Sequence, residues 1–167
     1  MRNIEHHGGS PERIFIGGHS AGGHLAASVA LRHDLLAARG LAPSAIKACF
    51  PVSCTYNLRY RDPQPGTAEH KTTFRVLRDP EDAEAMSPLS HVAGNRTPFF
   101  LAWGERDLER ARRTAGEMLP ALRAQPGRVE HHAFAGFDHF DMHLDQRRPE
   151  NAWVRKVRDW MTNPPAR

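Results

Sequence analysis

The sequence predicts an α/β fold in which about four mainly parallel strands form one sheet with flanking helices. Short apolar runs alternate along the chain with longer segments whose apolar residues recur at helical spacing. This alternation is typical of a parallel sheet covered on both faces. The chain has 167 residues, 40% of them hydrophobic, which is enough for one core. We therefore predict a single domain over residues 1–167.

The first strand and the helix after it are the most clearly marked elements. An apolar run at residues 13–17 ends in Gly-His-Ser-Ala-Gly, and the chain then becomes rich in alanine. This change of composition predicts a strand, a sharp turn and a helix. Ser20 lies at the turn, and we expect Gly18 and Gly22 to keep side chains out of a crowded bend, so that the Ser20 hydroxyl projects above the sheet edge.

The other predicted elements follow in alternating order. Three strands are expected at residues 45–53, 98–104 and 128–134, one helix at about residues 108–124, and a last helix after Pro149 with its apolar stripe at residues 153–161. Residues 55–97 are polar, contain several prolines and show no long periodic segment, so we expect an excursion above the sheet. Pro120 should bend its helix or end it early.

Composition and charge argue against several classes of partner. The net charge of +4 comes from arginines spread along the chain with acidic residues between them, which favours a solvated surface over nucleic-acid binding. No apolar stretch approaches the length of a membrane span and the N-terminus lacks an apolar signal core, so we expect a cytoplasmic protein. Cys49 and Cys54 are expected on opposite faces of one strand, reduced and without a metal.

Ser20 has the position of a nucleophile, and a serine hydroxyl acts as one only when a base and an orienting acid are near. The carboxyl ends of parallel strands share one edge of a sheet, so groups that follow the other strands should converge on Ser20. Asp107 follows the third predicted strand and is the candidate acid, with Glu105 as the nearest alternative. Acidic residues are also favoured at the start of a helix, so the alternative role of Asp107 is to stabilise the N-terminus of the next predicted helix.

A histidine after the fourth predicted strand completes the set. The chain has 11 histidines, so a surface role is the default for any one of them. His139 lies in a glycine-containing loop directly after that strand and is the candidate base. His132 lies within the strand, and His143 is the fallback. The candidates then occur along the chain in the order Ser, Asp, His.

Four blocks of sequence together resemble the α/β-hydrolase superfamily, namely Gly-His-Ser-Ala-Gly-Gly-His-Leu-Ala at 18–26, Ser-Pro-Leu-Ser at 87–90, Trp-Gly-Glu-Arg-Asp at 103–107 and Gly-Phe-Asp-His-Phe at 136–140. The likeness covers nearly the whole chain and is closest to kynurenine formamidase-like and hormone-sensitive-lipase-like esterases. It implies a triad of Ser20, Asp107 and His139, with the backbone N–H of Ala21 as one oxyanion donor. It also implies a small ester or N-formyl aryl amide substrate and no metal or other cofactor.

The position of the serine turn departs from the family pattern. Family members have several strands before this turn, and a His-Gly-Gly loop among them supplies further oxyanion donors. Here the turn lies within the first twenty residues, and we interpret His7, Gly8 and Gly9 as a turn before the first strand. We therefore expect the C-terminal part of a hydrolase, with the strand at 13–17 on an open edge that invites self-association. The alternative to an enzyme is a non-catalytic fragment or interaction module without a complete oxyanion hole.

Overall fold

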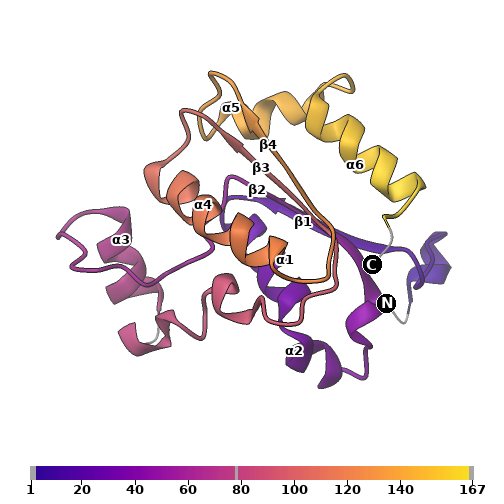
Figure 1. Ribbon diagram of the computed structural model, residues 1–167, viewed down its shortest axis with the longest axis horizontal. Coiled ribbons are helices and arrows are strands. Elements are labelled where there is room, and N and C mark those ends of the chain that lie inside the picture. The colour runs from indigo at the N-terminus through magenta and orange to yellow at the C-terminus, as the bar shows by residue number, and fades with distance from the viewer. Residues whose placement is uncertain (1–2, 78, 166–167) are drawn as a thin grey trace.

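Four parallel strands form one sheet in the computed structural model, which describes residues 3–77 and 79–165 (Figure 1). The strands are β1 (Ile14–His19), β2 (Ile46–Val52), β3 (Phe99–Gly104) and β4 (Val129–Phe134), and they lie side by side in chain order. All four lie within a few residues of their predicted positions. Because the strands are parallel, their carboxyl ends lie along the same edge of the sheet.

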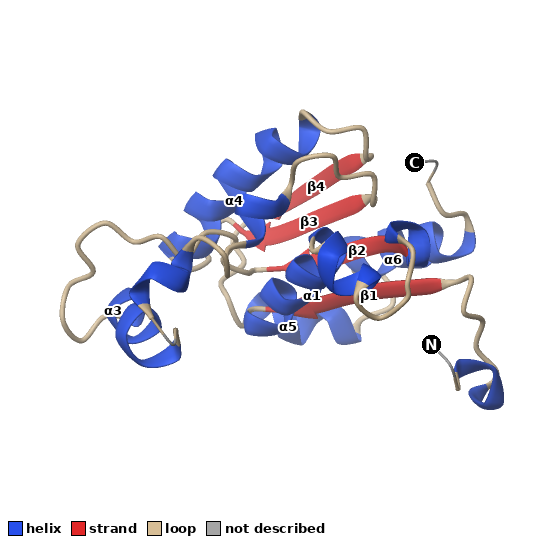
Figure 2. Ribbon diagram, turned by 90° about the horizontal axis from the view of Figure 1, so that it is seen from below, coloured by secondary structure: helices blue, strands red, loops and turns tan. Residues whose placement is uncertain are grey.

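Helices cover both faces of the sheet (Figure 2). On one face, α1 (Ala21–Leu31) and α4 (Glu109–Arg123) pack in one cluster with Cys49, Phe99 and Leu101. On the other face, Trp160 of α6 (Ala152–Thr162) packs against Ala48, Phe50 and Phe100. This division follows from the alternation of side chains along each strand. Alanines on the buried side of α1 allow that helix to lie close to the sheet.

The remaining helical elements are short. They are η1 (Ile4–His7), α2 (His33–Ala37), η2 (Pro43–Ala45), α3 (Ala68–Lys71), η3 (Thr72–Val76), η4 (Pro80–Ala83), η5 (Pro88–His91), α5 (Asp141–Leu144) and η6 (Asp145–Arg147). Four of them lie between β2 and β3, where the sequence predicted no long periodic segment. In the described part of the chain, no helix has both the length and the apolar character needed to cross a membrane.

Pro120 lies inside α4, which continues to Arg123, so of the two expected effects, a bend or an early end, the early end does not occur. A proline cannot donate a hydrogen bond, which leaves the carbonyl of Gly116 without its usual helical partner. Both residues are exposed, so water can take this bond. Helical bonding resumes at once, because the N–H of Ala124 donates to the carbonyl of Pro120 over 3.1 Å.

The two cysteines lie in the same hydrophobic cluster, which corrects the expectation that they face opposite sides of a strand. β2 ends at Val52, and Ser53 has a positive φ of 51°, which breaks the alternation before Cys54. Both thiols are free and buried. Burial raises the pKa of Cys54 to about 12 and that of Cys49 well above its usual range, so both remain protonated at neutral pH.

β1 forms one open edge of the sheet. The N–H of Ser20 donates to the carbonyl of Val52, and in a parallel ladder alternate residues face the same neighbour, so Phe15 and Gly17 direct their N–H groups away from β2. Exposed apolar side chains lie on the helix that follows, where Leu25 is 64% exposed. This edge therefore combines unpaired backbone groups with apolar surface nearby.

We expect the chain to self-associate through β1 at tens of micromolar, because such an edge is a template for pairing with another strand. In sedimentation velocity runs from low to tens of micromolar, the sedimentation coefficient should rise with concentration. Exchange of the Phe15 and Gly17 amide protons should slow over the same range. A monomer at every concentration, with a sharp cooperative melt, would contradict this prediction.

Candidate active site

Ser20 lies on a strained turn between β1 and α1. Its φ of 54° and ψ of −121° belong to a region that non-glycine residues rarely adopt. A Cβ on Gly18 would lie 2.5 Å from the backbone carbon of Gly22, and one on Gly23 would lie 2.7 Å from the carbonyl oxygen of Gly18. A Cβ on Gly22 would meet nothing within 4 Å. The crowded positions are therefore Gly18 and Gly23, and the expectation for Gly22 is wrong.

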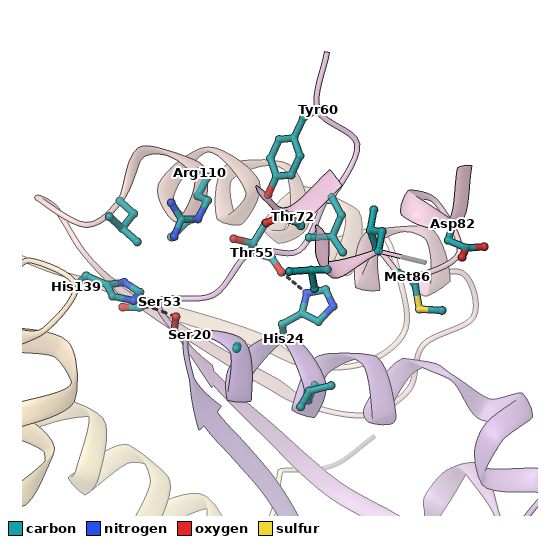
Figure 3. A pocket seen from close by; sticks show the side chains of 17 residues that line it. Ser20, His24, Ser53, Thr55, Tyr60, Thr72, Asp82, Met86, Arg110 and His139 are labelled. Atoms are coloured by element: carbon teal, nitrogen blue, oxygen red, sulfur yellow. Dashed lines mark hydrogen bonds between the residues drawn. The ribbon is translucent and has the colours of Figure 1, made fainter. Parts of the chain in front are cut away.

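The side chains of Ser20, His139 and Asp107 form one hydrogen-bonded chain, part of which is drawn in Figure 3. With the proton on Nδ1, the neutral ring of His139 donates to Oδ1 of Asp107 over 2.7 Å. Its Nε2 accepts from the Ser20 hydroxyl over 3.0 Å. The Asp107 side chain is fully buried and that of His139 is 12% exposed. This arrangement places a base against a hydroxyl and an acid behind the base.

Asp107 is oriented by the backbone of the turn between β3 and α4. The N–H of Leu108 donates to Oδ1 over 2.8 Å, and the N–H of Gly104 donates to Oδ2 over 3.3 Å. A buried carboxylate needs such donors to offset its loss of hydration. Glu105, the alternative acid, is exposed and takes no part in the chain of hydrogen bonds.

The loop that carries His139 is held against the same turn. The backbone N–H of Arg106 donates to the carbonyl of Phe137 over 2.9 Å, and the Arg106 Nε donates to the carbonyl of Gly136 over 2.6 Å. Gly104 allows this close approach, because a Cβ there would lie 2.1 Å from the carbonyl oxygen of Phe137. The positions of the acid and the base are thus coupled through backbone contacts.

His19 holds that loop from the side of β1. Its Nε2–H donates to the carbonyl oxygen of His139 over 2.8 Å, and its ring lies 4.6 Å from that of His139 and 5.2 Å from that of His143. Burial lowers the pKa of His19, which favours the neutral ring. Among the described residues, His139 forms the hydrogen bond with the Ser20 hydroxyl, and His143 and His132 do not. Within the described residues, no group of three or more His, Cys, Asp or Glu side chains could hold a metal ion.

The backbone N–H of Ala21 belongs to the first turn of α1, where N–H groups lack partners within the helix. The helix dipole makes this end attractive to negative charge. The segment at His7, Gly8 and Gly9 lies before the start of β1, whereas Ser20 follows its end. A strand of six residues is about 20 Å long, so β1 separates the two. The earlier segment is a turn in which Gly8 has a φ of 75°. Its place before the first strand agrees with the prediction.

A cavity of about 570 Å³ opens beside Ser20. α1 forms its floor, and the segment between β2 and β3 forms the wall above it (Figure 3). Much of the lining is apolar and comes from Leu25, Leu58, Val76, Leu77, Met86 and Leu108. Among the described residues of the lining, Asp82 and Arg110 are charged, and Nη1 of Arg110 lies 3.8 Å from Oε1 of Glu69. The sequence predicted the excursion but gave no sign of the cavity.

Ser87 joins the two ends of the wall segment through hydrogen bonds. Its hydroxyl accepts from the N–H of Leu58 over 2.8 Å and donates to the carbonyl of Ala83 over 2.6 Å. A backbone bond of 3.0 Å from the N–H of Leu89 to the carbonyl of Tyr56 lies next to it. The Ser-Pro-Leu-Ser block of the sequence therefore has a structural role at the base of the wall.

Ser53 is a residue of the site that the sequence analysis did not single out. It lies just after β2, lines the cavity and is 2% exposed. Its hydroxyl has no hydrogen-bond partner among the described residues, and its φ is positive. Both features cost free energy and are concentrated at functional sites. A serine after a buried strand is too common a pattern to have identified it.

Comparison with known proteins adds independent findings on the family and the fold. Residues 1–143 match a protein family described by the alpha/beta hydrolase fold. Esterase LipQ of Mycobacterium tuberculosis is 34% identical over 113 residues, which cover 63% of this chain and 27% of that protein. The isoprenylcysteine alpha-carbonyl methylesterase ICME of Arabidopsis thaliana is 28% identical over 156 residues, which cover 85% of this chain and 36% of that protein.

Solved structures show the same architecture. The butyrate-bound esterase Est2 of Thermogutta terrifontis superposes with a TM-score of 0.72 at 21% identity, covering 96% of this chain and 60% of that one. An esterase of Pyrobaculum calidifontis gives a TM-score of 0.73 at 21% identity, covering 96% of this chain and 56% of that one. The chain thus spans about a third of the curated relatives and somewhat over half of these structures.

Gly104→Ala should lower the free energy of unfolding by about 2 kcal/mol or more, because its Cβ would displace the backbone of Phe137. Gly116→Ala is the matched control, since a Cβ there meets nothing within 4 Å inside an exposed part of α4. It should raise that free energy by about 0.5–1 kcal/mol. Urea unfolding of both variants measures these changes. Equal changes in the free energy of unfolding would show that the contact between Gly104 and the Phe137 backbone is not tight.

Proposed function

The chain belongs to the α/β-hydrolase fold family, and from this premise we propose that it is a serine hydrolase that cleaves a small carboxylic ester or an N-formyl aryl amide. The observation that carries the proposal is the hydrogen-bonded chain of Ser20, His139 and Asp107 beside a cavity. Both curated relatives described above are esterases by name, which supports ester hydrolysis. The formamide alternative rests on the resemblance of the sequence blocks.

In the first half of the proposed reaction, Oγ of Ser20 attacks the carbonyl carbon of the substrate while Nε2 of His139 takes the hydroxyl proton. The new C–O bond forms as the carbonyl electron pair moves onto oxygen. Asp107 stabilises the imidazolium through its bond to Nδ1. The N–H of Ala21, at the positive end of α1, faces the developing oxyanion in this scheme.

Collapse of the tetrahedral intermediate expels the alcohol or the arylamine, which takes the proton from Nε2 of His139. The acyl or formyl group then remains on Ser20 as an ester. Water attacks this ester, with His139 again as the base, and Ser20 recovers its proton as the acid or formate leaves. Each half includes one proton transfer between Oγ of Ser20 and Nε2 of His139, which are 3.0 Å apart.

Ser20→Ala should reduce hydrolysis of p-nitrophenyl butyrate by at least about a thousandfold while the melting temperature stays close to that of the parent chain, because it removes one hydroxyl. Losses in His139→Ala and Asp107→Asn should not add to it, since the three groups act as a unit. A fluorophosphonate label should modify Ser20 stoichiometrically.

Undiminished turnover in Ser20→Ala would refute the assignment of the nucleophile. Absence of both labelling and turnover in the parent chain would instead favour the non-catalytic fragment or interaction module. Additive losses among the three variants would indicate separate roles for the three side chains.

Short acyl esters should be cleaved faster than long-chain ones, because a long chain that extends through the cavity must displace water from the Asp82 carboxylate. A series of p-nitrophenyl esters from acetate to palmitate measures this preference. Asp82→Leu should raise the rate for the long-chain esters relative to the short ones. Faster cleavage of palmitate than of butyrate by the parent chain would contradict the prediction.

A further inference from the structure

His24 lies one helical turn after Ser20 and lines the same cavity (Figure 3). Its backbone N–H donates to the carbonyl of Ser20 over 3.1 Å, which is the first hydrogen bond of α1. Ser20 and His24 both line this cavity, so a substrate whose carbonyl lies at Ser20 extends along the wall that carries the His24 ring.

One nitrogen of that ring is already occupied. Nδ1 lies 2.7 Å from the carbonyl oxygen of Thr55, and because a carbonyl can only accept, Nδ1 carries a proton. In the neutral ring Nε2 is then unprotonated and can only accept. Nε2 has no hydrogen-bond partner among the described residues and is not among the atoms sealed from solvent.

Two other polar groups of the lining have partners within the protein, whereas the buried hydroxyl of Ser53 has none among the described residues. The hydroxyl of Thr72 donates to the carbonyl of Ala68 over 2.8 Å, and Arg110 faces Glu69. The lining near His24 is otherwise largely apolar. An acceptor in such a wall discriminates between substrates, because an apolar group placed against it takes away its water and returns no hydrogen bond.

We propose that Nε2 of His24 selects substrates that carry an N–H or O–H donor a few atoms from the scissile carbonyl. This inference rests on the proposed function, because it places that carbonyl at Ser20. A hydroxyl on the third carbon of an acyl chain carries a donor beyond the scissile carbonyl, and its hydrogen bond extends about 2.8 Å further. β-Hydroxyacyl esters are therefore the simplest members of the class.

Three p-nitrophenyl esters, the first two of nearly equal shape, test the proposal at pH 8. The 3-hydroxybutyrate ester has the donor, the 3-methylbutyrate ester replaces the hydroxyl with a methyl group, and the 3-methoxybutyrate ester keeps the oxygen without its proton. The parent chain should favour the hydroxy ester in kcat/KM by about threefold to tenfold, the value expected for one neutral hydrogen bond. Equal values for the three esters would overturn the proposal.

Two variants separate the acceptor from the packing of the ring. In His24→Asn the amide nitrogen can still donate to Thr55, as Nδ1 does, but nothing remains at the position of Nε2. In His24→Gln the amide oxygen can replace Nε2 as acceptor. The preference for the hydroxy ester over the methyl ester, measured as a ratio of kcat/KM within each variant, should disappear in His24→Asn and persist in His24→Gln. A preference retained in His24→Asn would overturn the proposal.

Equilibrium binding to Ser20→Ala makes the test independent of turnover. This variant should bind the intact hydroxy ester more tightly than the methyl ester, and the added change His24→Asn should remove the difference. If the parent chain cleaves none of the esters but this difference is found, the proposed function fails and the role of His24 stands. If Ser20→Ala binds the two esters equally, the role of His24 fails whatever the turnover.

Discussion

The hydrogen bond from the N–H of Ser20 to the carbonyl of Val52 fixes the geometry on which the site depends. It extends the pairing of β1 and β2 by one residue into the turn and so holds Ser20 in a conformation that a free chain would avoid. The close contact of Gly18 with the Gly22 backbone leaves no room for a wider turn. α1 must therefore begin at the next residue, and this brings both the Ala21 N–H and the His24 ring to the cavity side of the sheet.

His139 is positioned from two sides by different elements. His19, at the end of β1, bonds to the His139 carbonyl, while Arg106 and Gly104, at the end of β3, hold the preceding residues of the loop. The His139 ring is thus set by the sheet and not by its own exposed loop. Because burial lowers the pKa of His19, the neutral His19 ring holds the His139 carbonyl without adding charge beside the His139 ring.

Much of this arrangement could be predicted from the sequence, because strand-forming runs and chemical groups alternate with a regular period. The strands, the order of the helices and the meeting of Ser20, Asp107 and His139 at one edge follow from that pattern. What could not be predicted depends on contacts between distant segments.

Gly22 and Gly23 cannot be distinguished locally, since only the packing of Cys54 and Gly18 against Gly23 separates them. The turn at Ser53 that redirects Cys54 has no sequence signal. The comparisons support the family and the fold independently of these contacts.

The bonds of Ser87 at the base of the cavity wall separate the wall segment from the sheet that carries the triad residues. The wall contributes none of Ser20, Asp107 and His139, and its two ends are joined, so its length and composition can change at little entropic cost to the sheet. Such a segment is an exchangeable cassette: recombining it among homologues would alter the lining of the cavity while the hydrogen-bonded chain of Ser20, His139 and Asp107 is inherited intact.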